Sequence, residues 1–296
     1  MQSLSGDTDV NRNYFAPRIY SVVVLIFCVF TFSSKTFASR AEDRTSQPMK
    51  LVWSDEFDYD GPPDPQKWAF ETGGGGWGNS ELENYTDRLD NCRVENGHLV
   101  IEVKREDYED SKYTSARLHS LGDGWKFGRI DIKAKLPGGS GTWPALWMLP
   151  THPKYGDLGW PDNGEIDIME YAAHEPGQVL GSIYSKNHIW WNHTGLSVYQ
   201  SVPTAESDFH IYSVQWSQDS VALLVDGVAY NSYPNPQTNW EDFPYDQQYR
   251  LIMNIAVGGW GGDEVDDAAL PQTMMIDYVR VYQPDGTAPT PNTQIL

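Results

Sequence analysis

The sequence predicts an all-β sandwich, and three observations lead to that prediction. Short apolar runs rich in β-favouring residues recur along the chain, and no stretch keeps a helical period over a useful length. Glycine and proline separate these runs, with 26 glycines and 19 prolines among 296 residues. The runs do not alternate with helical segments, as a parallel sheet would require. Many short strands with turn residues between them are typical of a β-sandwich.

Turn signals and alternating apolar residues place the expected strands. Asp226-Gly227 between two short apolar runs is the strongest hairpin signal, and Asn96-Gly97 before another run is a second. The other expected strands are read from their β-type composition. They cover residues 51–57, 98–104, 127–136, 209–216, 249–257 and 274–283.

Residues 1–38 are interpreted as a secretory signal, which predicts a secreted protein, extracellular or periplasmic. Arg12 and Arg18 precede an apolar run at residues 19–32, and residues 36–38 resemble a small-residue cleavage site. The apolar run is shorter than the ~20 residues that a membrane-spanning helix usually needs. A signal that is not cleaved and anchors the protein is the alternative.

The rest of the chain predicts one large domain with two short flanking segments. We expect residues 39–50 to be flexible, residues 51–284 to form the domain, and residues 285–296 to be a Pro/Thr-rich tail. The formal net charge of −20 makes nucleic acid and anionic membrane surfaces poor partners. We therefore expect a monomer with no membrane contact after signal cleavage. Cys92 is the only cysteine beyond residue 38, so no intrachain disulfide is expected.

The stretch EIDIME places Glu165, Asp167 and Glu170 within six residues of an otherwise apolar run. In a regular strand Glu165 and Asp167 share a face, and Glu170 falls on the opposite one. One extra residue, Ile168 or Met169, absorbed as a β-bulge returns Glu170 to the first face. The spacing therefore predicts a bulged strand with three acids on one wall.

Carboxyl groups gathered on one wall suit glycoside hydrolysis. A retaining glycosidase needs one carboxylate as nucleophile and one carboxylic acid as acid/base, ~5–5.5 Å apart. A third acid, Asp167, can orient one glutamate and bias which group holds a proton. From the spacing alone two other interpretations stay open: a solvent-facing strand with ordinary surface acids, and a divalent-metal site built from clustered carboxylates.

The EIDIME stretch resembles the signature of glycoside hydrolase family 16, in the bulged form that occurs in laminarinases, agarases and carrageenases. The lichenase branch has a version one residue shorter. The resemblance covers nearly all of the chain after the signal, through several motifs in the same order. They are GWGNSELENYT at residues 76–86, YTSAR at 113–117, GTWPALWMLP at 141–150 and IDYVRVY at 276–282.

The resemblance implies a β-jelly roll of two curved antiparallel sheets, with a substrate groove on the concave face. It implies endo-hydrolysis with retention and no cofactor for catalysis, with Glu165 as nucleophile, Glu170 as acid/base and Asp167 assisting. It also assigns substrate contacts to tryptophans that bound the sugar sites and to polar side chains that bind hydroxyls. These residues are Trp143, Trp147, Trp160, Asn79, Arg117 and Asn254. The alternatives are core packing for the tryptophans and a structural salt bridge for the arginine.

Many relatives in this family bind calcium away from the chemistry, and the matching positions are Glu56, the Gly97 carbonyl and Asp277. Such hard oxygen ligands suit a stabilising calcium ion, and ordinary surface acids are the alternative. One departure from the family is Tyr184, where many relatives carry a histidine near the acid/base. The resemblance places the segment 184–195 on the aglycone side, so the departure concerns fine specificity.

The function expected from the resemblance is a secreted endo-β-1,3-glucanase of laminarinase type, with a β-glucan polysaccharide as its partner. Mixed-linkage β-1,3-1,4-glucan or a marine galactan is the alternative substrate. A sulfated galactan would call for a basic groove, of which the acidic composition gives no sign. A carbohydrate-binding protein without catalysis is a different class, and the presence of both Glu165 and Glu170 weighs against it.

Overall fold

The computed structural model describes residues 48–262 and 264–285. The expectations for residues 1–38 and 286–296, and most of the segment 39–50, lie outside these residues. The described part consists of two mostly antiparallel β-sheets, with short 3₁₀ helices at Trp190–Asn192 and Gly259–Gly261. The predicted all-β jelly roll is therefore confirmed. No helix in the described part is long and apolar enough to cross a membrane.

The larger sheet has the strand order β15-β14-β13-β8-β17-β5-β6-β3, with β1 paired to β17 and β4 paired to β5. Its strands are β1 (Met49–Asp55), β3 (Glu83–Tyr85), β4 (Cys92–Glu95), β5 (His98–Tyr108), β6 (Ser111–Ser115), β8 (Gly128–Lys135), β13 (His210–Trp216), β14 (Ser220–Val225), β15 (Val228–Pro234) and β17 (Gln272–Pro284).

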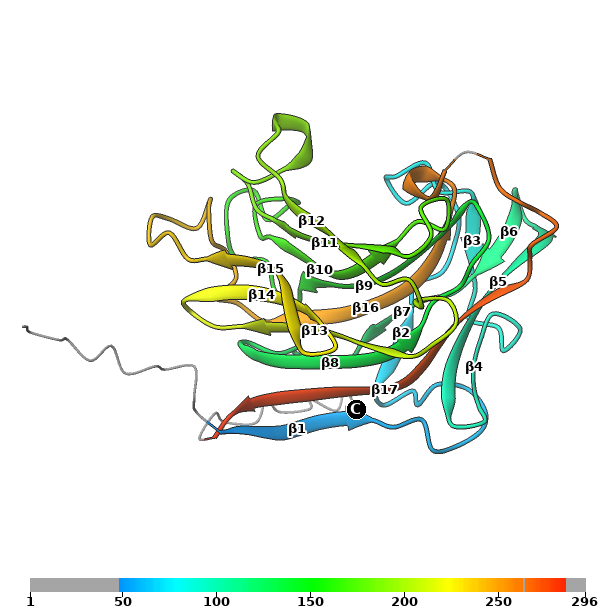
Figure 1. The fold of residues 1–296 in the computed structure, drawn as a ribbon, viewed down its shortest axis with the longest axis horizontal. Coiled ribbons are helices and arrows are strands. Elements are labelled where there is room, and N and C mark those ends of the chain that lie inside the picture. Colours follow the sequence, from blue (N-terminus) through cyan, green and yellow to red (C-terminus); the bar gives the residue numbers. More distant parts are fainter. Residues whose placement is uncertain (1–47, 263, 286–296) are drawn as a thin grey trace, which may run out of the picture. The chain divides into compact units, whose positions relative to one another are not determined.

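The smaller sheet has the strand order β12-β11-β10-β9-β16-β7-β2. Its strands are β2 (Trp68–Phe70), β7 (Arg117–Ser120), β9 (Thr142–Pro150), β10 (Glu165–Tyr171), β11 (Gln178–Tyr184), β12 (Leu196–Ser201) and β16 (Tyr249–Val257). Figure 1 shows β9, β10, β11 and β16 as one curved layer and β8, β17 and β1 as a second layer.

Apolar residues on alternate positions fill the space between the two layers. In β8, Ile130, Ile132 and Ala134 are buried, and the residues between them are partly exposed. In β17, Val279 and Val281 are buried in the same way. This period of two is what a strand with one face in a core requires. The other face of each such strand is then free to carry polar side chains.

Both predicted hairpins are present. The strand predicted at 249–257 matches β16, whereas most of the other predicted strands differ from the observed ones by one to four residues at an end. Glu95 pairs with His98 across one turn, and Val225 pairs with Val228 across the other. The first strand begins at Met49 instead of residue 51, because it extends its ladder to the end of β17. The sequence did not indicate β2, β3 and β7, because strands of three or four residues are too short to show alternation. The longer strands β6, β9, β11 and β12 were also absent from the prediction.

Candidate active site

The predicted bulge lies in β10 and turns all three acids to one face of the smaller sheet. Against β9, Asp167 pairs with Trp147 and Met169 with the next residue, so Ile168 is the extra residue. Ile168 and Met169 are both buried in the core, which returns Glu170 to the side of Glu165 and Asp167. The bulge is thus what converts an alternating strand into a wall of acids.

Glycine is required directly before this strand. Gly164 has a φ of +75°, a conformation that residues with a side chain rarely adopt. A Cβ there would lie 2.9 Å from the Tyr249 hydroxyl oxygen and 2.9 Å from a ring carbon of Tyr245. The chain can therefore enter β10 close to these buried rings only because residue 164 has no side chain.

The register of the smaller sheet lines up a row of residues across its strands. From β12 to β7, each residue of this row pairs with the next across adjacent strands. Alternation gives all of them the same face of the sheet. The row consists of Tyr199, Leu180, Glu170, Ala145, Asn254 and Arg117. A groove that follows this row therefore crosses the strands and passes over the acids.

Two hollows meet at the acids and form the groove. The larger one, of about 680 Å³, extends over β11 and β12, and the smaller one, of about 50 Å³, extends over β9, β16 and β7. Both are lined by Glu165, Asp167 and Glu170. We call the smaller side the polar arm and define it by Asn79, Glu81, Arg117, Trp147 and Asn254. We call the larger side the aromatic arm and define it by Trp160, Tyr184, Trp190 and Tyr199.

The three acids hold their protons more tightly than free carboxyl groups do. Burial and the charges of Glu165 and Glu170 raise the pKa of Asp167 well above its usual range. Burial and the charge of Glu165 raise the pKa of Glu170 to about 8, although a hydrogen bond from Trp143 opposes this rise. Burial raises the pKa of Glu165 to about 7, against hydrogen bonds from Asp167 and Trp160 and the positive charge of Arg117. At neutral pH the site therefore holds both protonated and ionised carboxyl groups.

Arg117 in the polar arm is held by a salt bridge and by two aromatic rings. Its Nε donates to Glu71 Oε2 at 2.5 Å, and its guanidinium lies 4.7 Å from the ring centres of both Trp77 and Trp147. The structural salt bridge that was the alternative for this residue is thus present. Its two Nη groups make no hydrogen bond within the described residues, so they remain free to donate into the groove.

The other members of the polar arm are joined in one hydrogen-bonded chain. The Trp147 indole N–H donates to Asn254 Oδ1 at 2.8 Å, and Asn254 Nδ2 donates to the Tyr85 hydroxyl at 3.1 Å. Tyr85 donates to Glu81 Oε2 at 3.0 Å, and Asn79 Nδ2 donates to Glu81 Oε1 at 3.1 Å. The structure therefore brings together three of the predicted substrate residues, Asn79, Trp147 and Asn254.

The remaining predicted tryptophans lie near the acids. The Trp143 indole N–H donates to Glu170 Oε1 at 3.0 Å, and its ring packs edge-to-face on Trp260. Trp160 lies in the aromatic arm and packs edge-to-face on Tyr184 and on Trp191. Neither tryptophan is in the buried core, so core packing does not explain them. Trp143 acts directly on the carboxyl group that the resemblance assigns as acid/base.

The comparisons with known proteins agree with this geometry. Residues 80–280 match the family model described as glycosyl hydrolases family 16. The chain belongs to this family. A β-glucanase from Rhodothermus marinus is 50% identical over 245 residues, which cover 79% of this chain and 85% of that protein.

Solved structures of family members share the fold as well. The laminarinase from Rhodothermus marinus superposes with a TM-score of 0.78 at 48% identity, over 80% of this chain and 98% of that one. A non-specific endo-β-1,3(4)-glucanase of the family superposes with a TM-score of 0.75 at 41% identity, over 81% of this chain and 93% of that one. The glycoside hydrolase assignment from the sequence is thus confirmed.

Several residues of this family-16 groove were not recognised from the sequence. Glu71, which fixes Arg117, lies outside the motifs, and its partner is 46 positions away. Trp260 lines the groove, and its place in the Gly-rich stretch GGWGG was a usable signal for an exposed ring. Trp190 and Tyr199 also line the groove, and the sequence assigned neither of them a substrate contact.

The three positions predicted for calcium lie near one edge of β17, on the sheet that does not carry the acids. Asp277 is in β17, Glu56 follows β1, and Gly97 precedes β5, and both of these strands pair with β17. Both carboxylates are already balanced by cations. Arg280 donates to Glu56 at 2.8–3.2 Å, and Lys133 Nζ lies 2.6 Å from Asp277 Oδ2.

This charge balance does not fit a divalent cation unless the two basic side chains turn away. Calcium at these positions stays a prediction, and the chemistry of the three acids does not depend on it. The described residues also contain no group of three or more histidine, cysteine, aspartate or glutamate side chains that could hold a metal ion.

Proposed function

We propose that this family-16 protein is a secreted, retaining endo-β-1,3-glucanase of laminarinase type. The observation that carries the proposal is the bulge in β10, which puts Glu165, Asp167 and Glu170 on one wall where the two arms of the groove meet. An acid cluster at the middle of a groove can cleave within a chain, because sugar units bind on both sides of the reacting bond. The names of the similar proteins from Rhodothermus marinus support β-glucan as the substrate.

In the first step Glu165 is the nucleophile and Glu170 is the general acid. The carboxylate of Glu165 attacks the anomeric carbon, and the glycosidic bond breaks as Glu170 gives its proton to the leaving oxygen. The product is a glycosyl ester of Glu165. The higher pKa of Glu170 suits this division, because Glu170 keeps its proton at a pH at which Glu165 begins to lose its own.

In the second step Glu170 acts as a base. It takes a proton from water, the water oxygen attacks the anomeric carbon from the opposite side, and the bond to Glu165 breaks with overall retention. Asp167 assists by holding a proton between the glutamates. Its raised pKa makes it a donor to Glu165, and a hydrogen bond from Asp167 stabilises Glu165 as a carboxylate both before the attack and after its release.

The proposal is tested by comparing the wild type with Glu165→Ser on laminarin. We expect the wild type to release oligosaccharides with the β-configuration at the new reducing end, as seen by NMR within the first minutes. The variant should be at least about 10⁴-fold slower, because no nucleophile remains. If azide restores turnover and gives an α-glycosyl azide, Glu165 is the nucleophile. A variant as fast as the wild type would remove Glu165 from this role.

Mixed-linkage glucan is the second candidate substrate. The similarity to a non-specific endo-β-1,3(4)-glucanase favours it, because that protein shares the fold over most of this chain. Initial rates on laminarin, lichenan and agarose under equal conditions separate the candidates. A rate on lichenan equal to that on laminarin would widen the proposed specificity, and cleavage of agarose alone would replace it.

Secretion is proposed from the sequence of residues 1–38. The two arginines before the apolar run and the small residues after it support an export signal. Expression of the full chain, followed by cell fractionation and N-terminal sequencing of the mature protein, tests this part. An intact N-terminus in the membrane fraction would indicate an anchor instead.

A further inference from the structure

Three rings of the aromatic arm, and Trp191 beside them, are largely exposed to water. Trp190 is 63% exposed, Trp191 and Tyr199 are 51% exposed, and Trp160 is 46% exposed. Large rings with so much surface in water usually mark a binding site, because an exposed apolar ring gains nothing for folding. These rings are contiguous. Trp160 packs on Trp191 with ring centres 5.2 Å apart, and Trp191 packs on Trp190 with ring centres 5.5 Å apart.

The segment that carries Trp190 and Trp191 is anchored firmly at its base. Lys186 Nζ lies 3.1 Å from Glu241 Oε1, and Asn187 Nδ2 donates to Asp242 Oδ1 at 2.8 Å. His188 Nε2 and the Tyr233 hydroxyl are 2.9 Å apart. These contacts hold the two tryptophans above the sheet, so their exposure does not come from a loose chain.

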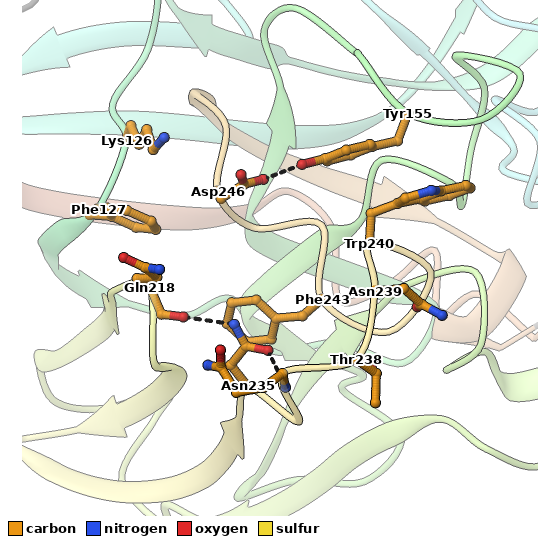
Figure 2. A pocket seen from close by; sticks show the side chains of 11 residues that line it. Lys126, Phe127, Tyr155, Gln218, Asn235, Thr238, Asn239, Trp240, Phe243 and Asp246 are labelled. Carbon is orange, nitrogen blue, oxygen red and sulfur yellow. Dashed lines mark hydrogen bonds between the residues drawn. The ribbon is translucent and has the colours of Figure 1, made fainter.

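Residues 235–246 also form a second anchor, through contacts with the β9–β10 connection. Trp240 stacks on Tyr155 with the two ring planes 2° apart, and the Tyr155 hydroxyl donates to Asp246 Oδ1 at 2.6 Å. Figure 2 shows this stack at the wall of a pocket outside the groove. Tyr155 belongs to the same β9–β10 connection as Trp160, so both aromatic loops of the arm rest on the 235–246 segment.

The rings of the aromatic arm and the adjacent Trp191 differ in their positions relative to the hollow. Trp190 and Tyr199 line the hollow together with Trp160, whereas Trp191 does not line it and packs edge-on against Trp160 and Trp190. Tyr199 belongs to the row that crosses the sheet through Glu170. A sugar chain that lies along this row beyond Glu170 would therefore cross Leu180 and reach Tyr199, and Trp190 lines the same hollow.

We propose that Trp190 and Tyr199 form additional subsites for glucosyl units that extend from the cleavage point over β11 and β12. This inference rests on the proposed glucanase function and names two residues that set its chain-length preference. The C–H faces of a neutral sugar pack on aromatic rings, which suits a ligand without charge in a hollow whose lining has no basic residue. Trp191 is a positioning residue that supports Trp160 and Trp190 from behind.

The arm recognises chain length more than linkage. The Trp190 indole N–H makes no hydrogen bond within the described residues, and its ring offers a flat apolar face. Such a face binds any sugar ring of suitable orientation, whereas the hydrogen-bonded polar arm demands particular hydroxyl positions. Long substrates that reach Trp190 and Tyr199 should therefore be cleaved faster than short ones that end before these rings.

The test compares kcat/KM on laminaritriose and on laminariheptaose for the wild type, Trp190→Ala and Tyr199→Ala. Each variant should lower the ratio of the long to the short substrate by at least about fivefold, which corresponds to roughly 1 kcal/mol of lost stacking. Trp190→Phe should restore part of the ratio, because a smaller ring still offers a face. Leu89→Ala, at an exposed apolar residue outside the groove, is the control and should leave the ratio unchanged.

Two results would overturn the proposal. An unchanged ratio in both alanine variants would show that the rings do not contact the longer substrate. Equal losses of kcat/KM on both substrates would also leave the ratio unchanged. Together with a lower melting temperature, such losses would show a structural role. Failure of the underlying function looks different, because the wild type would then cleave neither oligosaccharide.

Discussion

The polar arm and the aromatic arm of the groove hold their side chains in different ways. In the polar arm each side chain is fixed by another, from Arg117 with Glu71 to Trp147 with Asn254. In the aromatic arm the rings make edge-to-face contacts and are exposed to water, as Trp160 is where it packs on Tyr184 and on the adjacent Trp191. One arm is therefore built before the substrate arrives, and the other offers surface that the substrate covers.

This difference indicates that specificity and affinity come from different arms of the same groove. Fixed donors reject a sugar whose hydroxyls are misplaced, because an unmatched buried polar group is costly. Exposed rings accept many orientations and gain free energy from the area that becomes buried. The acids lie between the two arms. A sugar that is correctly bound in the polar arm therefore positions the reacting bond at the acids, and the aromatic arm raises the affinity for longer chains.

The largest effect is expected from Arg117→Ala, which tests whether the fixed side chains of the polar arm select the substrate. The change removes the cation between Trp77 and Trp147, leaves Glu71 with weaker partners, and takes away a charge that lowers the pKa of Glu165. We expect kcat/KM on laminarin to fall about 100-fold, and stability to fall by roughly 3 kcal/mol, since a mostly buried ion pair loses one partner. Denaturant unfolding and initial rates measure the two effects.

Arg117→Lys and Arg129→Ala are the controls for this prediction. Lysine keeps the charge but loses the planar group that stacks between two rings, so it should recover stability better than activity. Arg129 forms a comparable pair with Asp131 at 2.6 Å on the other sheet, and its loss should leave activity unchanged. Full activity in Arg117→Ala would mean that the polar arm does not select the substrate through this residue.

The arrangement of the acids could be predicted from the sequence, but the contacts that fix the side chains of the two arms could not. The bulge could be predicted, because three acids in six residues reveal the strand period directly. The polar arm could be named in part from motifs, yet its links from Tyr85 to Asn254 and from Glu71 to Arg117 join residues far apart in the chain. Such long-range partners depend on the register of the sheet, which local alternation does not determine.

The orientation of the rings in the aromatic arm could not be predicted from the sequence either. Adjacent tryptophans at 190 and 191 are visible in the sequence, but alternation cannot tell which ring faces the groove. The structure separates them, because the short 3₁₀ helix at Trp190–Asn192 turns Trp190 to the hollow. The paired cations at the predicted calcium positions were equally hidden, because they come from neighbouring strands.

A smaller effect is expected from Trp143→Phe at the junction of the arms. The indole N–H that donates to Glu170 favours the carboxylate and lowers the pKa of Glu170, which burial and the charge of Glu165 raise to about 8. Without this donor the pKa of Glu170 rises further, so the general acid keeps its proton to higher pH. The alkaline limb of the kcat/KM profile should therefore move to higher pH, and the acidic limb, governed by Glu165, should stay.

Trp260→Phe is the matched control for the pH profile. Trp260 packs on Trp143 with ring centres 5.7 Å apart but has no hydrogen bond to Glu170. Its replacement tests the effect of altered packing alone, and the alkaline limb should not move. An alkaline limb that shifts equally in both variants would show that packing, and not the hydrogen bond, controls the proton of Glu170.

The smallest expected effect concerns a buried acid behind the polar arm. Glu83 is fully buried, one of its oxygens accepts the Val257 N–H at 2.6 Å, and the other has no partner within the described residues. Burial and the charge of Glu81 raise its pKa well above the usual 4.5. The unfolded chain ionises Glu83 near 4.5, so above that pH it holds fewer protons than the folded chain, and stability decreases as the pH rises.

Glu83→Gln removes this pH-dependent cost and keeps the acceptor for Val257. Its amide can donate to Glu81, and Glu81 accepts hydrogen bonds from Asn79 and Tyr85 in the polar arm. We expect a melting temperature about 2–4 °C higher at pH 8, since a gain of roughly 1 kcal/mol has that effect in a domain of this size. The gain should be smaller at pH 5, and Glu264→Gln, at an exposed acid, should give none. A lower melting temperature at pH 8 would mean that the charge of Glu83 is used by the fold, and that the polar arm depends on a buried anion instead of tolerating one.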